Sequence, residues 1–462
     1  MRQPKRSILR RVKAAVRDAR SGGQSLLSRG LRGGLSILGG QAYVSLLRLA
    51  SNLIMTRLLY PEAFGLMLIV TLVFTAFGMF SDVGVRNAII VKKGTIEEGY
   101  LDTAWTMLVV RGWLLCGLGL LLAQPISHFY EEPILAGLVV LASFAPAIQG
   151  WASPEPILYE KRVALARVVT WGLISQTAST AFILVALAIK PSIWILAANG
   201  VVAASVSVAL SYWMFRGHSP RLRWSQPVVR EIFGFGKWVI LGTALTFLAR
   251  QGDALIVSTY LTASQLGVFS IAMSFAKLVE LLIEKLSWSL LFPIYSELRN
   301  HEVSRLYSQL TRIKLILWAI CLPFILMFGV FGREFVSFLY DPRYHEAGWM
   351  LELLALGSVF FAVGGAIINI PLSFGDSKRH MWLQFFRFVS LIGCLFVGAS
   401  QAGIVGLLVG IVVAQVAFYP ILMAATHKFG IRGYGSDITF MVLMSAVLVM
   451  VWSIKGWPLP AS

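Results

Sequence analysis

Two arginines lie near the middle of long apolar segments, where a charged side chain is unusual. Arg48 and Arg250 are 202 residues apart, the sequences around them are alike, and the same separation aligns Gly65 with Gly267. A guanidinium at mid-membrane depth costs about 3 kcal/mol on insertion scales, so it normally faces a protein interior or a wet cavity. The two positions therefore predict a repeated membrane protein with a cationic cavity, and the natural occupant of such a cavity is an anion.

Further charges in these segments share helix faces. Asp253 lies three residues after Arg250, and Lys277, Glu280 and Glu284 form one stripe of the following segment. Two interpretations are open. The charges form ion pairs that hold helices in register, or the carboxylates bind a coupling ion, either H⁺ or Na⁺.

Asp82 and Arg86 lie towards the end of an earlier segment. They are four residues apart, a spacing that predicts a local ion pair. The 202-residue offset also places Asp82 opposite Glu284, which makes Asp82 a second coupling candidate.

The other arginines have no acidic residue three or four positions away. Besides Arg48, which has Asn52 one turn later as a polar neighbour, these are Arg111 and Arg387. Together with Arg250 and Lys277, these three arginines are the cavity cations that we expect to bind the substrate, and the sum is an excess of cations over carboxylates at depth. Such an excess suits a phosphate, a pyrophosphate or an acidic sugar, because the arginine fork can bind phosphate through two parallel hydrogen bonds.

Composition places all these charges in a membrane. The chain has 462 residues, 57% hydrophobic and 13% charged, with a net charge of +18, whereas a soluble domain carries about 25% charged residues. Cys116, Cys321 and Cys394 lie in separate apolar runs, so we expect neither a disulfide framework nor a metal site. The chain also contains no GxxxxGK[ST] phosphate loop, and no cofactor is expected.

The apolar runs predict an all-α polytopic fold with thirteen spanning helices. Their predicted ranges are 35–59, 65–91, 104–125, 133–152, 164–189, 192–215, 233–261, 265–292, 312–339, 347–371, 380–399, 403–426 and 438–454. Lysine and arginine, Lys314 among them, concentrate in alternate loops, which predicts a cytoplasmic N-terminus.

A polar linker at 216–232 separates an N-terminal lobe at 35–215 from a C-terminal lobe at 233–428, and one extra helix follows at 438–454. Each lobe has six helices, which predicts a parallel repeat. A second repeated motif supports the division, because a Pro-containing stretch ends in Lys161-Arg162 in one lobe and in Lys378-Arg379 in the other.

Residues 1–34 hold ten Lys/Arg and one Asp, which is half of the net charge. A basic amphipathic helix on an anionic bilayer and a disordered cytoplasmic tail both fit this composition. No nucleic-acid partner is expected, because nothing beyond charge supports one.

Several stretches together resemble the Wzx-type polysaccharide flippases, within the larger MATE-like group that also holds the multidrug-and-toxin extruders and the lipid II flippase. The stretches are residues 56–66, 81–90, 250–257, 266–272 and 291–296. The resemblance implies translocation of undecaprenyl-pyrophosphate-linked oligosaccharide across the bacterial inner membrane by alternating access, without ATP hydrolysis. It implies that Arg48 and Arg250 contact the pyrophosphate and sugar, and that a polysaccharide polymerase and its chain-length machinery are partners. Family members have 12 or 14 helices, so a thirteenth is a departure.

Three other functions remain as alternatives. A MATE-type cation-coupled drug antiporter binds organic cations and should carry net acidic charge at depth. A membrane polysaccharide polymerase or ligase needs catalytic groups on a sizeable outward loop, and the loops on that side are short. A scaffold protein, the remaining possibility, has no use for unpaired arginines.

Overall fold

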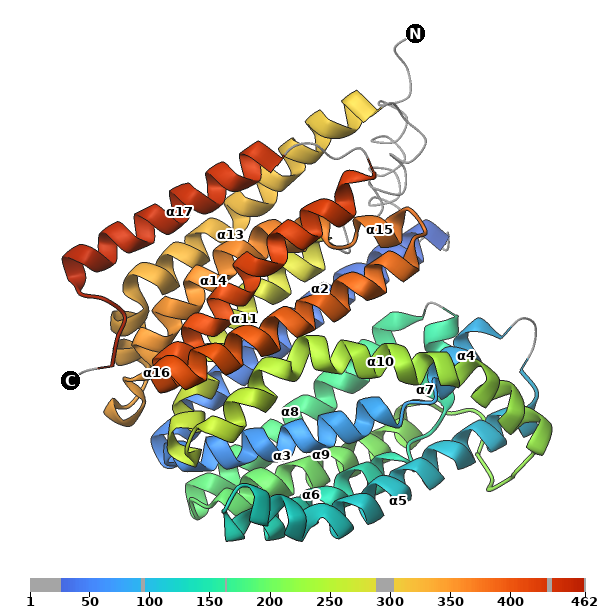
Figure 1. Ribbon diagram of the computed structural model, residues 1–462. Coiled ribbons are helices and arrows are strands. Elements are labelled where there is room, and N and C mark those ends of the chain that lie inside the picture. Colours follow the sequence, from blue (N-terminus) through green and yellow to red (C-terminus); the bar gives the residue numbers. More distant parts are fainter. Residues whose placement is uncertain (1–25, 93–95, 163, 288–302, 430–433, 461–462) are drawn as a thin grey trace. The chain divides into compact units, whose positions relative to one another are not determined.

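The computed structural model describes residues 26–92, 96–162, 164–287, 303–429 and 434–460 (Figure 1). All regular elements in these ranges are helical, and each of the thirteen predicted spans falls mainly on helical structure where it is described. The spans at 380–399 and 403–426 are the two halves of one interrupted helix, and the span at 65–91 covers two helices. The prediction for the basic tail falls mostly on residues 1–25, which lie outside the described residues. The side chain of Arg250 also lies outside the described part, although its backbone belongs to a helix.

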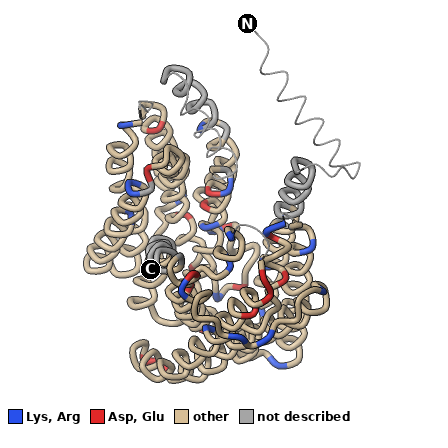
Figure 2. The backbone as a smooth tube through the Cα atoms, turned by 90° about the vertical axis from the view of Figure 1, so that its right-hand side faces the viewer, with Lys and Arg blue, Asp and Glu red and all other residues tan. Residues whose placement is uncertain are grey.

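Nine helices of the described ranges are long and apolar enough to cross a membrane. Charged positions are sparse along them, as the long tan stretches of Figure 2 show. The fold is therefore that of an all-α, multi-pass membrane protein.

The chain divides into two compact units, and the division falls inside two helices. Unit 1 comprises residues 1–59 and 73–243, and unit 2 comprises residues 60–72 and 244–462. The divided helices are α3 (Pro61–Phe80) and α10 (Gln226–Tyr260).

Unit 1 is a bundle in which helices distant in sequence pack side by side. Its order of neighbours is α5, α6, α9, α8 and α2, and the short helices α4 and α7 pack on each other. The bounds are α2 (Leu26–Leu58), α4 (Val85–Val91), α5 (Glu98–Phe129), α6 (Pro133–Gln149), α7 (Glu155–Lys161), α8 (Leu165–Ile189) and α9 (Ile193–Met214).

Unit 2 is built around one central helix. Its elements are α11 (Ala263–Leu286), α13 (Val303–Leu339), η2 (Pro342–Tyr344), α14 (Ala347–Ile367), α15 (Ile370–Ser373), α16 (Ser377–His427) and α17 (Tyr434–Lys455). α14 contacts α11, α13, α16 and α17, and 72% of its candidate span is buried. Because α14 is apolar all round, it is stable only with neighbours on every side.

α16 is a helical hairpin. Ala402 and Gly403 leave the helical conformation, and Gly403 has φ +54°, which favours glycine. The arms then pack tightly, since a Cβ on Gly398 would overlap the carbonyl oxygen of Gly406 and the reverse also holds. The two predicted helices at 380–399 and 403–426 are the arms of this hairpin.

The glycines aligned by the repeat meet in unit 2. A Cβ on Gly65 would overlap the carbonyl oxygen of Ala263, at the start of α11. A Cβ on Gly267 would overlap the carbonyl oxygen of Pro61, at the start of α3. The 202-residue offset aligns Gly65 with Gly267 and Pro61 with Ala263, so the two contacts are equivalent and the first turns of α3 and α11 cross as equivalent elements of the internal repeat.

The helix predicted at 65–91 is interrupted. α3 ends at Phe80 and α4 begins at Val85, after Gly84 with φ +67°. The break removes the helical spacing between Asp82 and Arg86, and the local ion pair predicted for them is wrong. The Asp82 carboxylate instead accepts the Gly84 backbone N–H at 2.9 Å, and Arg86 pairs with Glu160 at 2.6 Å.

Candidate functional site

A charged cavity of about 210 Å³ lies inside unit 2. α10, α11, α14 and both arms of α16 line it, so it brings together segments more than 150 residues apart in sequence. Five of the predicted site residues meet there, namely Asp253, Lys277, Glu280, Glu284 and Arg387. The volume holds several water molecules or one small hydrated ion and is below the range of about 300–1,000 Å³ typical of drug-sized ligands.

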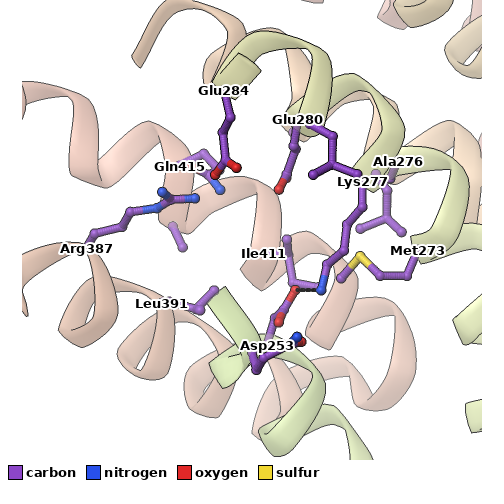
Figure 3. Close-up of a pocket in the computed structure, with 15 residues that line it drawn as sticks. Asp253, Met273, Ala276, Lys277, Glu280, Glu284, Arg387, Leu391, Ile411 and Gln415 are labelled. Carbon is purple, nitrogen blue, oxygen red and sulfur yellow. Dashed lines mark ion pairs between the residues drawn. The ribbon is translucent and has the colours of Figure 1, made fainter. Parts of the chain in front are cut away.

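One ion pair crosses the cavity (Figure 3). The Lys277 ammonium on α11 lies 3.6 Å from the Asp253 carboxylate on α10. The other oxygen of Asp253 accepts the backbone N–H of Ala254 at 2.8 Å. Lys277 therefore bridges two helices, α11 and α10.

The two remaining carboxylates lie one turn apart along α11. Figure 3 shows the guanidinium of Arg387, on the first arm of α16, directed towards Glu284. Arg387 also lies 5.0 Å from the centre of the Phe361 ring, an attractive cation–π distance. The arginine thus faces both a carboxylate and an aromatic ring of unit 2.

The charges that line this cavity do not balance. Three carboxylates face two cations among the described lining residues, and the side chain of Arg250 lies outside the description. Gln251 and Gln415 add neutral hydrogen-bonding groups that sequence reasoning missed, because amides in apolar runs give no charge signal. The Lys277–Asp253 ion pair can therefore be exchanged for other pairs. A cation can compete with Lys277 for Asp253, and an anion can compete with Asp253 for Lys277.

Arg111 lies in unit 1, where it holds the end of α3. Its guanidinium donates to the Ser81 hydroxyl at 2.9 Å and to the Gly78 carbonyl oxygen at 2.5 Å. Cations near a helix C-terminus stabilise the last carbonyl groups. These bonds give Arg111 a structural role at the point where α3 breaks.

Arg48 and Asn52 belong to α2 of unit 1. The Arg48 side chain is exposed and Asn52 is half-buried. The guanidinium of Arg48 makes no hydrogen bond or ion pair to the residues that the structure describes. Arg48 thus belongs to unit 1, whereas the five residues gathered in the cavity belong to unit 2.

A buried ion pair was missed altogether. Lys314 on α13, 2% exposed, pairs at 2.8 Å with Asp437 on α17, which is fully buried and also accepts the Tyr419 hydroxyl at 2.9 Å. Lys314 had been assigned to a basic loop from its charge, and Asp437 had been placed just outside the last span. Both assignments are corrected, because the two charges neutralise each other inside the helix bundle.

The polar linker at 216–232 is held to the rest of unit 1 by hydrogen bonds. The His218 ring lies 2.6 Å from buried Asp102, and the His218 backbone N–H donates to Glu155 at 2.8 Å. The backbone N–H of Arg221 adds a second bond to Asp102 at 3.0 Å. The linker is thus fixed to the ends of α5 and α7 within unit 1.

The described residues contain no cluster of three or more His, Cys, Asp or Glu side chains placed to hold a metal ion. The cavity in unit 2 is lined by charged and amide side chains within an otherwise apolar helix bundle.

Comparison with known proteins identifies the chain. The family described as polysaccharide biosynthesis protein matches residues 54–348, more than half of the sequence. The chain belongs to this family. It is 23% identical over 363 residues to the succinoglycan biosynthesis transport protein ExoT of Rhizobium meliloti (strain 1021), covering 76% of this chain and 71% of the relative.

Two solved structures share the fold of this polysaccharide biosynthesis protein. The lipid II flippase MurJ, in an inward closed conformation, matches with a TM-score of 0.69 at 12% identity, over 92% of this chain and 93% of that one. A multidrug resistance MATE family transporter in an inward-facing conformation matches with a TM-score of 0.62 at 16% identity, over 89% and 96%. The fold is thus the two-lobed, MATE-like fold with one additional C-terminal helix.

Proposed function

We propose that this protein is a flippase that carries a polyprenyl-pyrophosphate-linked oligosaccharide from one membrane leaflet to the other for surface polysaccharide biosynthesis. Membership of the polysaccharide biosynthesis family is the observation that carries the proposal. The name of the succinoglycan transport relative and the shared fold with a lipid II flippase point the same way. The function is transport, and the chain is not proposed to be an enzyme.

The charged cavity of unit 2 serves coupling in this proposal. Its volume of about 210 Å³ suits an ion or a single phosphate group and leaves no room for an oligosaccharide. Asp253, Glu280 and Glu284 take up H⁺ or Na⁺, and Lys277 and Arg387 supply the counter-charges that change partner. Because a buried charge left without a partner is costly, occupancy of this cavity biases the conformation of unit 2.

Arg48 and Arg250 are proposed to contact the pyrophosphate of the substrate. Arg48 is exposed and free of protein partners among the described residues, as an anion receptor must be before it is loaded. Replacement of Arg48 by Ala should abolish export while protein abundance stays normal. Replacement by Lys should restore export only in part, because an ammonium lacks the planar fork of the guanidinium.

Orientation and location are part of the same proposal. The basic loops support a cytoplasmic N-terminus. The family supports the bacterial inner membrane as the location, where a polysaccharide polymerase and chain-length machinery would receive the flipped product.

The decisive test is deletion of the gene followed by analysis of lipid-linked sugars. The oligosaccharide-lipid should accumulate on the cytoplasmic side, and complementation with the wild-type chain should clear it. Normal surface polysaccharide in the deletion strain, without such accumulation, would contradict the proposal.

One observation favours a second candidate, a cation-coupled drug antiporter. The described lining of the unit 2 cavity carries three carboxylates against two cations, as an organic-cation site requires. The same deletion strain distinguishes the two functions: an antiporter predicts sensitivity to cationic dyes with unchanged polysaccharide, and a flippase predicts the reverse.

A further inference from the structure

A second hollow of unit 2 lies at the start of α16 and is distinct from the charged cavity. It has a volume of about 420 Å³ and is open to the outside of the bundle. We call it the α16 groove and define it by Lys378, Arg379, Trp382 and Phe386 on the first arm and Ile421 and Ala425 on the second. Trp382 and Phe386 are one turn apart and follow one stripe of the arm, whereas Arg387, in the charged cavity, lies on another face.

The α16 groove is cationic at its end and apolar along its floor. Lys378 is exposed and makes no hydrogen bond or ion pair with any residue that the structure describes. Arg379 lies 3.6 Å from Asp376 and faces the Phe429 ring at 5.4 Å, so its charge is only partly compensated. Trp382 and Phe386 are 45% and 42% exposed, which makes them an uncovered aromatic surface directly below the two cations.

The internal repeat shows that this arrangement is peculiar to unit 2. The equivalent basic pair in unit 1 is Lys161-Arg162, and there Lys161 is engaged: its ammonium donates to the carbonyl oxygens of Ile89 at 3.2 Å and Lys92 at 2.5 Å. In unit 1 that lysine closes the end of a short helix, and in unit 2 its counterpart Lys378 is free. The positions equivalent to Trp382 and Phe386 are Leu165 and Val169, so the aromatic floor is also confined to unit 2.

We propose that the α16 groove binds an anionic phospholipid of the leaflet on the side of the basic loops. Lys378 and Arg379 hold the phosphate of the head group, and Trp382 and Phe386 support the first part of an acyl chain. Basic pockets between membrane helices bind phosphate head groups, and tryptophan favours this depth of the bilayer. The Asp376 carboxylate also belongs to the lining, beside Arg379, so the head of the α16 groove keeps one net positive charge for a phosphate.

The test uses the purified full-length protein and native mass spectrometry after delipidation. Phosphatidylglycerol, phosphatidylcholine and undecaprenyl phosphate are each titrated separately. The wild type should retain phosphatidylglycerol at lower concentration than phosphatidylcholine. The double variant Lys378→Gln/Arg379→Gln should need at least about fivefold more phosphatidylglycerol for the same occupancy, because each interfacial cation contributes a comparable factor.

A matched control removes the same number of charges elsewhere on the same predicted face. Arg216 and Arg230 are exposed and belong to the linker region and the start of α10, so Arg216→Gln/Arg230→Gln should bind phosphatidylglycerol like the wild type. Trp382→Ala/Phe386→Ala keeps the charge and should weaken both phospholipids. Lys378→Gln alone changes an exposed residue without described partners, so the test does not depend on the folding of the double variants.

Equal phosphatidylglycerol binding by the wild type and the Lys378→Gln/Arg379→Gln variant would overturn the proposal, as would an equal loss in the Arg216→Gln/Arg230→Gln control. Undecaprenyl phosphate would be the ligand, contrary to the proposal, if it bound more tightly than phosphatidylglycerol and its binding depended on Lys378. The measured lipid occupancy requires no glycan transport, so the result tests the lipid-binding proposal separately from the proposed flippase activity.

Discussion

At the scale of residues, two ion pairs of this protein differ in burial, and the sequences around them do not reveal the difference. Lys277 and Asp253 meet at 3.6 Å in a polar cavity with side chains still 30% and 14% exposed. Lys314 and Asp437 meet at 2.8 Å with side chains at most 3% exposed. The first pair has room and neighbours with which to exchange, and the second is enclosed, so we expect them to respond differently to substitution.

A double-mutant cycle tests the exchangeable pair. Asp253→Asn should lower export at least about tenfold if the carboxylate takes part in coupling, and Lys277→Gln should do so as well. Combining the two should not restore export, although it removes the unpaired charge. Polysaccharide export is measured together with protein abundance, and restoration to wild-type export in the double variant would reduce the pair to a structural bridge.

The enclosed pair should respond in the opposite way. Asp437→Asn leaves the Lys314 ammonium buried without a counter-charge, and such a loss costs about 3–5 kcal/mol. The thermal midpoint in detergent should fall markedly. The variant Lys314→Met/Asp437→Leu removes both charges and should recover most of the loss, since apolar residues often replace a buried pair at little cost. A midpoint unchanged in Asp437→Asn would show that the pair contributes nothing to stability.

At the scale of elements, close helix crossings rest on glycines that the repeat had already aligned. Gly65 and Gly267 lie at the crossing of α3 and α11, each against a first-turn carbonyl of the other helix. Gly398 and Gly406 make the same kind of reciprocal contact in the α16 hairpin. The absence of a side chain lets two backbones touch, as is common in membrane helix packing.

Alanine substitution should therefore have opposite effects at two positions of α3. Gly65→Ala forces the first turns of α3 and α11 apart and should lower the thermal midpoint and export together. Gly78→Ala on the same helix meets nothing within 4 Å and should be neutral or stabilising by up to about 1 kcal/mol, because alanine favours helix. Similar losses in both variants would indicate that helix propensity, and not the crossing, governs α3.

At the scale of the whole molecule, local pattern predicted where the helices form and singled out five charged residues that line one cavity, but it did not predict which charges pair. The apolar runs fall on helical structure in the described part of the chain, and the charges on one face of α11 do line a cavity. The partners Arg86–Glu160 and Lys314–Asp437 were inaccessible to sequence, because they join residues 74 and 123 positions apart. Their pairing depends on which helices pack, and a single sequence carries that information only weakly.

The packing of the additional helix α17 against α13 shows in which direction α17 runs, which hydropathy alone does not show. Lys314 on α13 bonds Asp437 on α17, and the Trp452 indole donates to the Gly329 carbonyl oxygen, both across a separation of 123 residues. At the far end Lys455 bonds Glu334 across 121 residues. A nearly constant separation means that α17 runs parallel to α13 over its full length, so the two begin on the same side of the membrane.

If α13 crosses the membrane outwards, α17 must do so too, and the residues after it emerge opposite the N-terminus. Single cysteines at Glu131 and Leu459 should then react with a membrane-impermeant thiol reagent from outside, since both lie in segments predicted to be outward and are exposed. A cysteine at Arg221, in the basic linker, should react only after permeabilisation. Labelling of the Leu459 position only after permeabilisation, with Glu131 labelled from outside, would show that α17 returns to the side of the basic loops. The parallel pairing with α13 would then be wrong.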